Sequence, residues 1–255
     1  MAKAKTTAVT GVNKWDEELA AMAAEASGQE IVSSSFLSTR GGRLSYKGNE
    51  VPDNKMNVVI LAAVHENLFY TDRYDPENPA PPVCYAFGEH DKGLEPHEEA
   101  TEKQSADCAS CPNNVFGSAD SGKGKACKNS RRLTLLTEDD LEDVGAAELA
   151  QLKIPVTSVK NWSNYVSTLA NTMKRPPFAV VTEISVIPDS KTQFKVCFKP
   201  VGQITDGEVL QALMDRRPAA LEAMMQPYPA PQPKPEPPAR GARPAAGANA
   251  KGRKY

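Results

Sequence analysis

The sequence lacks any long apolar run. No segment approaches the roughly 20 consecutive apolar residues that a helix needs to cross a bilayer. The chain begins Met1-Ala-Lys-Ala-Lys and shows no apolar block of the kind found in a secretory signal. These absences predict an intracellular, cytoplasmic protein with no membrane partner.

Histidine is scarce too, and no grouping of residues suits catalysis. The chain has three histidines in 255 residues. Acidic side chains gather at residues 89–107 and 138–148, but as surface runs without the pairing that acid–base chemistry requires. We therefore expect a protein that is not an enzyme. A nuclease is the enzymatic alternative, and Mg²⁺-dependent turnover would reveal it.

Proline and positive charge concentrate at one end of the chain. The formal net charge is −2 overall. Residues 227–255 nevertheless carry eight of the 21 prolines, seven alanines, and six basic residues against one acidic residue. Such a segment cannot bury enough apolar surface to offset the entropy of ordering, so we predict a disordered basic tail. It serves either as a solubilising linker or as an electrostatic arm for nucleic acid.

Short segments rich in β-branched residues predict a mainly antiparallel sheet. Gly41-Gly42 suits a tight turn between the first two strands, and Pro188-Asp-Ser-Lys suits a turn between the last two. The expected strands are residues 31–38, 43–47, 56–64, 82–88, 131–136, 178–187 and 193–201.

Helices are expected on either side of these strands. Apolar residues repeat at three- and four-residue spacing over 158–174, and Pro176-Pro177 ends that helix. A last helix is expected to begin at Thr205 with a Thr-x-x-Glu capping box and to be interrupted at Pro218. The predicted fold class is α+β, an OB-like barrel with flanking helices. Its parts are an N-terminal helical extension (1–30, with a helix at 14–27), the β domain (31–204) with an insert at 84–130, a C-terminal helix (205–226) and the tail (227–255).

Four of the five cysteines have the spacing of a metal site. Cys108 and Cys111 form a Cys-x-x-Cys knuckle followed by proline, Cys127 comes 16 positions later, and Cys84 lies upstream on an expected strand. Four thiolates complete the tetrahedral shell of a structural zinc ion. We therefore predict a zinc ribbon, with zinc as the cofactor, that pins the insert to the sheet. Cys197 is expected to be a reduced bystander.

Two alternatives to the four-cysteine site remain open. His90 or His97 could replace Cys84 as the fourth ligand, since both lie inside the insert. A thioredoxin-like redox site would also use Cys-x-x-Cys, but it requires the knuckle at a helix start within a βαβ unit. The sequence around Cys108 predicts no such unit.

Basic and aromatic residues are interleaved in a way that suits single-stranded nucleic acid. Arg40 and Arg43 flank Gly41-Gly42, and like charges opposed across a hairpin favour an anion between them. Aromatic rings can stack on unpaired bases while basic side chains neutralise phosphates. The predicted contact residues are Arg40, Arg43, Tyr46, Tyr85, Lys123, Lys125, Lys128, Arg131, Arg132, Lys195 and Lys199.

Several segments resemble zinc-ribbon-bearing proteins of tailed bacteriophages. They are Cys108-Ala-Ser-Cys-Pro-Asn-Asn-Val-Phe-Gly-Ser, the run Gly-Lys-Gly-Lys-Ala-Cys-Lys-Asn-Ser-Arg-Arg-Leu that ends at Leu133, Ser38-Thr-Arg-Gly-Gly-Arg-Leu-Ser-Tyr and Pro81-Pro-Val-Cys-Tyr-Ala. The resemblance covers about residues 31–200. It implies the plan of phage single-stranded DNA-binding proteins, an OB-type barrel with a zinc insert, in the host cell cytoplasm. Such proteins commonly end in an acidic tail that recruits partners, whereas this chain ends in a basic one.

The sequence therefore predicts a single-stranded DNA-binding protein that acts in phage replication or recombination. Its partners would be single-stranded DNA and proteins of those two processes. The alternative is a zinc-ribbon transcription or assembly factor that binds a protein partner. A preference for a protein over free DNA would favour that alternative.

Overall fold

The computed structural model describes residues 36–72 and 80–228, together with Leu19. The expected helix at 14–27, apart from Leu19, and the expected tail from residue 229 onward lie outside these residues. The strands are β1 (Phe36–Ser38), β2 (Ser45–Tyr46), β3 (Asn49–Glu50), β4 (Lys55–Phe69), β5 (Cys84–Gly88), β6 (Lys128–Thr137), β7 (Ala150–Ile154), β8 (Val180–Asp189) and β9 (Gln193–Gln203). The helices are α2 (Val159–Thr168), which continues as a π-helical turn over Leu169–Met173, and α3 (Gly207–Met224). Short 3₁₀ turns occur at Arg40–Gly42, Pro52–Asn54, Pro112–Asn114, Asp139–Glu142, Val156–Ser158 and Pro177–Ala179.

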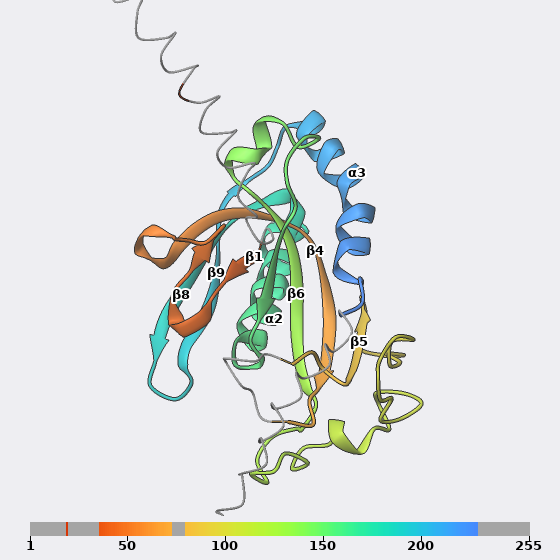
Figure 1. Ribbon diagram of the computed structural model, residues 1–255. Coiled ribbons are helices and arrows are strands. Elements are labelled where there is room, and N and C mark those ends of the chain that lie inside the picture. Colours follow the sequence, from red (N-terminus) through yellow and green to blue (C-terminus); the bar gives the residue numbers. More distant parts are fainter. Residues whose placement is uncertain (1–18, 20–35, 73–79, 229–255) are drawn as a thin grey trace, which may run out of the picture.

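The nine strands form one strongly curled sheet, a half-barrel (Figure 1). Its order is β3-β2-β1-β7-β6-β4-β8-β9, with β5 added beside β4. Every pairing is antiparallel except that of β1 with β7. Bulges between Ile60 and Ala62 and between Val181 and Thr182 increase the local twist. An α+β fold with a mainly antiparallel curled sheet is thus confirmed, and the finer assignment to an OB-type barrel stays a prediction.

Helix α2 lies in the hollow of the curled sheet (Figure 1). Its Trp162 and Tyr165 are buried against Val58, Leu133 and Ile184 of three different strands. The hydroxyl of Tyr165 also hydrogen-bonds the Thr182 hydroxyl at 2.5 Å, so a buried polar group of the sheet is satisfied. The apolar residues whose spacing predicted this helix therefore include side chains that are buried in the core.

Helix α3 covers the opposite face of the sheet. Leu213, Ala220 and Met224 pack there with Val59 and Val64 of β4. The carboxylate of Asp206 caps the helix by accepting hydrogen bonds from the backbone amides of residues 208 and 209. Two details of the sequence prediction are corrected: the cap is Asp206 rather than Thr205, and the helix runs through Pro218 without a break.

Strand β4 is buried on both faces because it lies between the two helices. This explains why its apolar run is almost continuous instead of alternating. On one side it pairs with β6 along most of its length. On the other side it changes neighbours, from β8 over residues 55–59 to β5 over residues 65–69. Residues 60–64 have no strand on that side within the described chain, which leaves a gap in the sheet.

The loop between β1 and β2 differs from the predicted tight hairpin. Ser38 pairs with Ser45, so the connection spans residues 39–44 rather than two glycines. Gly41 and Gly42 both have positive φ, at 66° and 76°, and Gly42 lies against Phe194 of β9. The structure also contains two strands that were not predicted, β3 and β7. No helix in the described ranges is both long enough and apolar enough to span a bilayer.

Candidate metal centre and nucleic-acid interface

The predicted insert is a long loop between β5 and β6. It lies at one end of the sheet, next to the ends of β4 and β5 (Figure 1). Its regular structure is confined to the turn at Pro112–Asn114. Backbone hydrogen bonds hold it to the sheet, including those from the His97 amide to the Tyr85 carbonyl at 2.7 Å and from the Glu102 amide to the Val83 carbonyl at 2.9 Å.

Polar side chains give the knuckle its local shape. The Asp107 carboxylate accepts from the Ser110 amide and the Ser110 hydroxyl, each at 2.7 Å. The Asn114 side chain donates to the Cys108 carbonyl at 2.7 Å. These bonds hold the chain in a compact turn between Cys108 and Cys111. Residues close to the knuckle in the sequence thus determine its shape.

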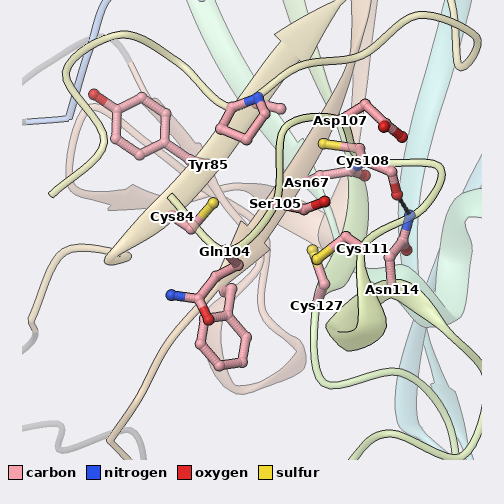
Figure 2. A pocket seen from close by; sticks show the side chains of 13 residues that line it. Asn67, Cys84, Tyr85, Gln104, Ser105, Asp107, Cys108, Cys111, Asn114 and Cys127 are labelled. Atoms are coloured by element: carbon pink, nitrogen blue, oxygen red, sulfur yellow. Dashed lines mark hydrogen bonds between the residues drawn. The ribbon is translucent and has the colours of Figure 1, made fainter. Parts of the chain in front are cut away.

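All four predicted ligands line one pocket (Figure 2). Cys84 lies at the start of β5, Cys108 and Cys111 come from the knuckle, and Cys127 directly precedes β6. Cys84, Cys111 and Cys127 are buried, and none of the four is in a disulfide. The pocket therefore lies where the two strands that flank the insert meet the knuckle in the middle of the insert.

The thiols share a desolvated environment. Burial, with a smaller contribution from the neighbouring thiols of Cys108, Cys111 and Cys84, raises the pKa of Cys127 to about 12. Burial likewise raises the pKa of Cys84 and of Cys108. Crowding four potential anions in this way opposes ionisation, whereas a bound divalent cation would reverse the effect and favour the thiolates.

The donor set fits zinc chemically, but the side chains do not meet at one point. Within the described residues, no group of three or more His, Cys, Asp or Glu side chains is positioned to hold a metal ion. Thiolate sulfurs must lie about 2.3 Å from zinc. The four cysteines would have to move inward from the pocket wall to reach that distance.

The structure gives no support to a histidine as the fourth ligand. His97 stacks on Tyr85, with ring centroids 5.0 Å apart, and its Nδ1 accepts from the Glu99 amide at 3.2 Å. Neither His97 nor His90 lines the cysteine pocket. Cys197 lies on β9, outside this pocket.

Three predicted lysine contacts lie in the insert or where it rejoins β6. Lys123 and Lys128 are exposed. Lys125 is partly buried, and its Nζ donates to Asn114 at 3.0 Å and Asn129 at 2.8 Å. This end of the molecule thus carries fixed positive charge beside the cysteine pocket.

Arg132 and Tyr85 have structural roles, and their prediction as nucleic-acid contacts is corrected. Arg132 pairs with the completely buried Glu66, and its guanidinium lies 4.7 Å from the Phe87 ring centroid. Tyr85 is 3% exposed, in ring contact with Phe87 and Tyr228. Because both side chains are used inside the protein, neither is available to a strand.

The other predicted contacts do not join the insert. Arg43 pairs with Glu50 at 2.7 Å, and Lys195 pairs with Asp189 at 2.6 Å. Lys199 is exposed on β9, the edge strand beyond β8. The remaining members of this set are Arg40 in the β1–β2 loop, Tyr46 on β2, next to Lys47, and Arg131 on β6, which pairs with His65 and lies outside the cysteine pocket. The expected face-to-face pair of Arg40 and Arg43 across a tight hairpin is therefore wrong, and the predicted residues form two separate groups.

An exposed aromatic residue was missed. Phe116 is 80% exposed and Val115 is 57% exposed, both in the insert between Cys111 and Cys127. Single exposed apolar side chains are common, but these two are adjacent, and Phe116 is the most exposed large hydrophobic side chain of the described residues. The position of Phe116 between two predicted ligands, in a run of small and basic residues, was the signal that could have found it.

The chain was compared with known protein families, curated proteins and solved structures. No family model matches the chain, and neither a curated protein nor a solved structure does. The resemblance to bacteriophage proteins therefore stays a prediction.

Proposed function

We propose that this protein binds single-stranded DNA through a zinc-stabilised insert. The observation that carries the proposal is the exposed ring of Phe116, in a loop whose two ends are bounded by the cysteines of one pocket. Cys84, Cys108, Cys111 and Cys127 would hold zinc as a closed structural site. Zinc would supply rigidity to the loop and no chemistry of its own.

Stacking and charge would act together on this surface. A base can stack on an exposed aromatic ring whatever its identity, while lysines neutralise the phosphates on either side. Lys123, Lys125 and Lys128 supply that charge. Binding would be stoichiometric rather than catalytic. The phage-like segments favour a role in replication or recombination, and the curled sheet is compatible with the OB-type plan that they imply.

Replacing Phe116 tests the stacking surface directly. Phe116→Ala should weaken binding to an unstructured single strand by about 1–3 kcal/mol, because a stacking contact is lost. Phe36→Ala is the matched control: Phe36 is also an exposed phenylalanine, at 46%, but it lies on β1. Fluorescence anisotropy of a labelled oligonucleotide would measure both affinities. An equal loss of affinity in the two variants would show that the insert is not part of the binding surface.

The salt dependence of binding tests the lysines. Each phosphate neutralised on a single strand contributes about −0.7 to the slope of log affinity against log salt. The double variant Lys123→Ala, Lys128→Ala should therefore bind with a slope shallower by about 1.4. The double variant Lys195→Ala, Lys199→Ala on β9 is the control and should keep the original slope. A slope that changes only in the β9 variant would transfer the DNA contact to that strand.

A protein-binding role is the second candidate, since Val115 and Phe116 also make an exposed apolar pair. Such a pair could insert into a pocket of a protein partner, as an assembly or transcription factor would require. Retention of the protein by a replication or transcription protein in the absence of DNA, lost in Phe116→Ala, would favour this role. Binding to purified oligonucleotides with the same dependence on Phe116 favours the DNA role.

A further inference from the structure

The gap beside β4 contains a pocket separate from the cysteine pocket. Residues 60–64 are unpaired there because β8 ends its pairing at Val59 and β5 begins at His65. The pocket reaches from this gap to α2 and the turn at Pro177–Ala179, with a volume of about 280 Å³. That is close to the lower end of ligand sites, roughly 300 Å³, and suits one small molecule.

Two guanidinium groups and an imidazole line this pocket. Arg131 lies directly opposite His65 in the pairing of β6 with β4, so both side chains project from the same face of the sheet. Arg217 comes from α3 and donates from its Nε to the Leu61 carbonyl at 3.1 Å. It therefore closes part of the gap through a fixed hydrogen bond.

His65 has a buried nitrogen without a hydrogen bond. Its Nδ1 lies 3.4 Å from a carboxylate oxygen of Asp91, at ion-pair distance, and makes no hydrogen bond within the described chain. Burial and the charge of Arg131 lower the pKa of His65, so the ring is neutral near pH 7 and offers one donor and one acceptor. Burial also lowers the pKa of Arg131, although this group stays charged at neutral pH. A buried ring nitrogen without a hydrogen bond is free to make one with a group that enters the pocket.

The remaining wall of the pocket is apolar. Trp162 and Phe178 line it together with Pro176 and Pro177. The guanidinium of Arg217 lies 4.9 Å from the Phe178 ring centroid, which fixes that ring in place. The pocket thus combines a wall for a planar apolar group with donors for an anionic oxygen.

We propose that this pocket binds one nucleotide, with its phosphate at Arg131 and His65 and its base along the Trp162 and Phe178 wall. Carboxylates at Glu89, which lines the pocket, and Asp91, beside His65, disfavour a highly charged polyphosphate. The ligand class is therefore a nucleoside monophosphate or one nucleotide of a strand. The strand-borne case rests on the proposed function, whereas binding of the free nucleotide does not.

Trp162 can report on this pocket. The chain has two tryptophans, Trp15 and Trp162, so Trp15→Phe leaves a single fluorophore on the pocket wall. In this full-length variant, titration with each deoxynucleoside monophosphate and with an unstructured oligonucleotide should change the fluorescence and saturate. Saturation-transfer NMR on the monophosphates gives a second readout that does not depend on the fluorophore.

Two further substitutions localise the response. Arg131→Gln should weaken binding of the monophosphates by about tenfold or more, because it removes one charged donor to the phosphate. Val166→Phe should abolish it by filling the pocket from α2. Thermal unfolding would verify that both variants fold, and Lys160→Gln, on the same helix but outside the pocket lining, should bind as the unmodified protein does.

The outcomes separate this inference from the proposed function. If neither fluorescence nor NMR detects saturable binding, or if Val166→Phe folds and binds unchanged, the pocket is not a nucleotide site. Strand binding that depends on Phe116 but leaves Trp162 unaffected would overturn the pocket and retain the insert as the DNA-binding surface. Monophosphate binding lost in Val166→Phe, without any strand binding, would establish the pocket and overturn the proposed function.

Discussion

Replacing Cys108 and Cys111 together by serine should release the zinc and unfold the insert. The unmodified protein should carry about one zinc ion per chain, because four thiolates complete a tetrahedral shell. Zinc binding to structural sites contributes apparent free energies of about 10–16 kcal/mol near pH 7. The insert has one short turn of regular structure, and scattered hydrogen bonds are what holds the rest of it, so loss of the metal should leave it open to unfolding.

Metal analysis and limited proteolysis would measure this effect. Zinc content should fall from about one to near zero per chain, and residues 89–127 should become the first site of cleavage. Cys197→Ser is the matched control because Cys197 lies on β9, outside the pocket, and it should keep its zinc. Full zinc retention after loss of both knuckle cysteines would refute the metal centre.

Glu66→Ala should be among the most destabilising single substitutions outside the apolar core. Glu66 has no solvent exposure, and its carboxylate accepts from Arg132, from Ser130 at 2.8 Å and from Tyr228 at 2.7 Å. Lys153 Nζ lies 3.2 Å from the same carboxylate. Removing the Glu66 carboxylate leaves the largely buried Arg132 without its counter-ion. The free energy of unfolding should therefore fall by about 3–5 kcal/mol.

A partly exposed ion pair provides the control for this prediction. Glu183 lies 3.7 Å from Lys55 at the sheet surface. Glu183→Ala should change the free energy of unfolding by only about 0–1 kcal/mol. Urea denaturation of both variants would measure the difference. Equal effects would show that the Glu66 cluster contributes no more than a surface pair.

The buried Glu66 carboxylate should also make the stability of the protein depend on pH. Burial alone would raise the pKa of Glu66, but the charges of Lys153 and Arg132 and the hydrogen bonds from Tyr228 and Ser130 outweigh it and lower the pKa. A lowered folded-state pKa contributes stability that is fully present above the unfolded value, about 4.3. That contribution should be lost as the pH falls through the folded-state value, and Glu66→Ala should remove this part of the acid sensitivity.

Local patterns predicted much of this fold. Alternating and β-branched residues located β4, β6, β8 and β9, because side-chain period follows directly from strand geometry. Helix α2 was found from its apolar spacing. The cysteine spacing brought four residues to one pocket because knuckle and strand positions are local properties. Strand β3 has two residues and cannot show a period. Strand β7, Ala150-Gln-Leu-Lys-Ile, is as long as β5 and does alternate apolar with polar residues, so its pattern was a signal that could have predicted it.

The features that the sequence did not predict depend on contacts between residues far apart in the chain. Arg131 and Arg132 are adjacent in sequence, but neighbouring strand residues face opposite sides, so one lines the gap pocket and the other meets Glu66. The partners of Arg132 come from β4 and from Tyr228, 66 and 96 residues away. The gap exists because β4 changes neighbours, which no local pattern indicates.

A competition titration tests the central claim most directly. The zinc-loaded protein would be titrated into a labelled single strand at fixed salt, with unlabelled single strand, duplex of the same sequence, or RNA as competitor. We expect the single strand to compete much better than the duplex, and this preference to shrink in Phe116→Ala, because stacking requires unpaired bases. Equal competition by strand and duplex, unchanged in Phe116→Ala, would contradict the assignment of the insert as a single-strand binding surface.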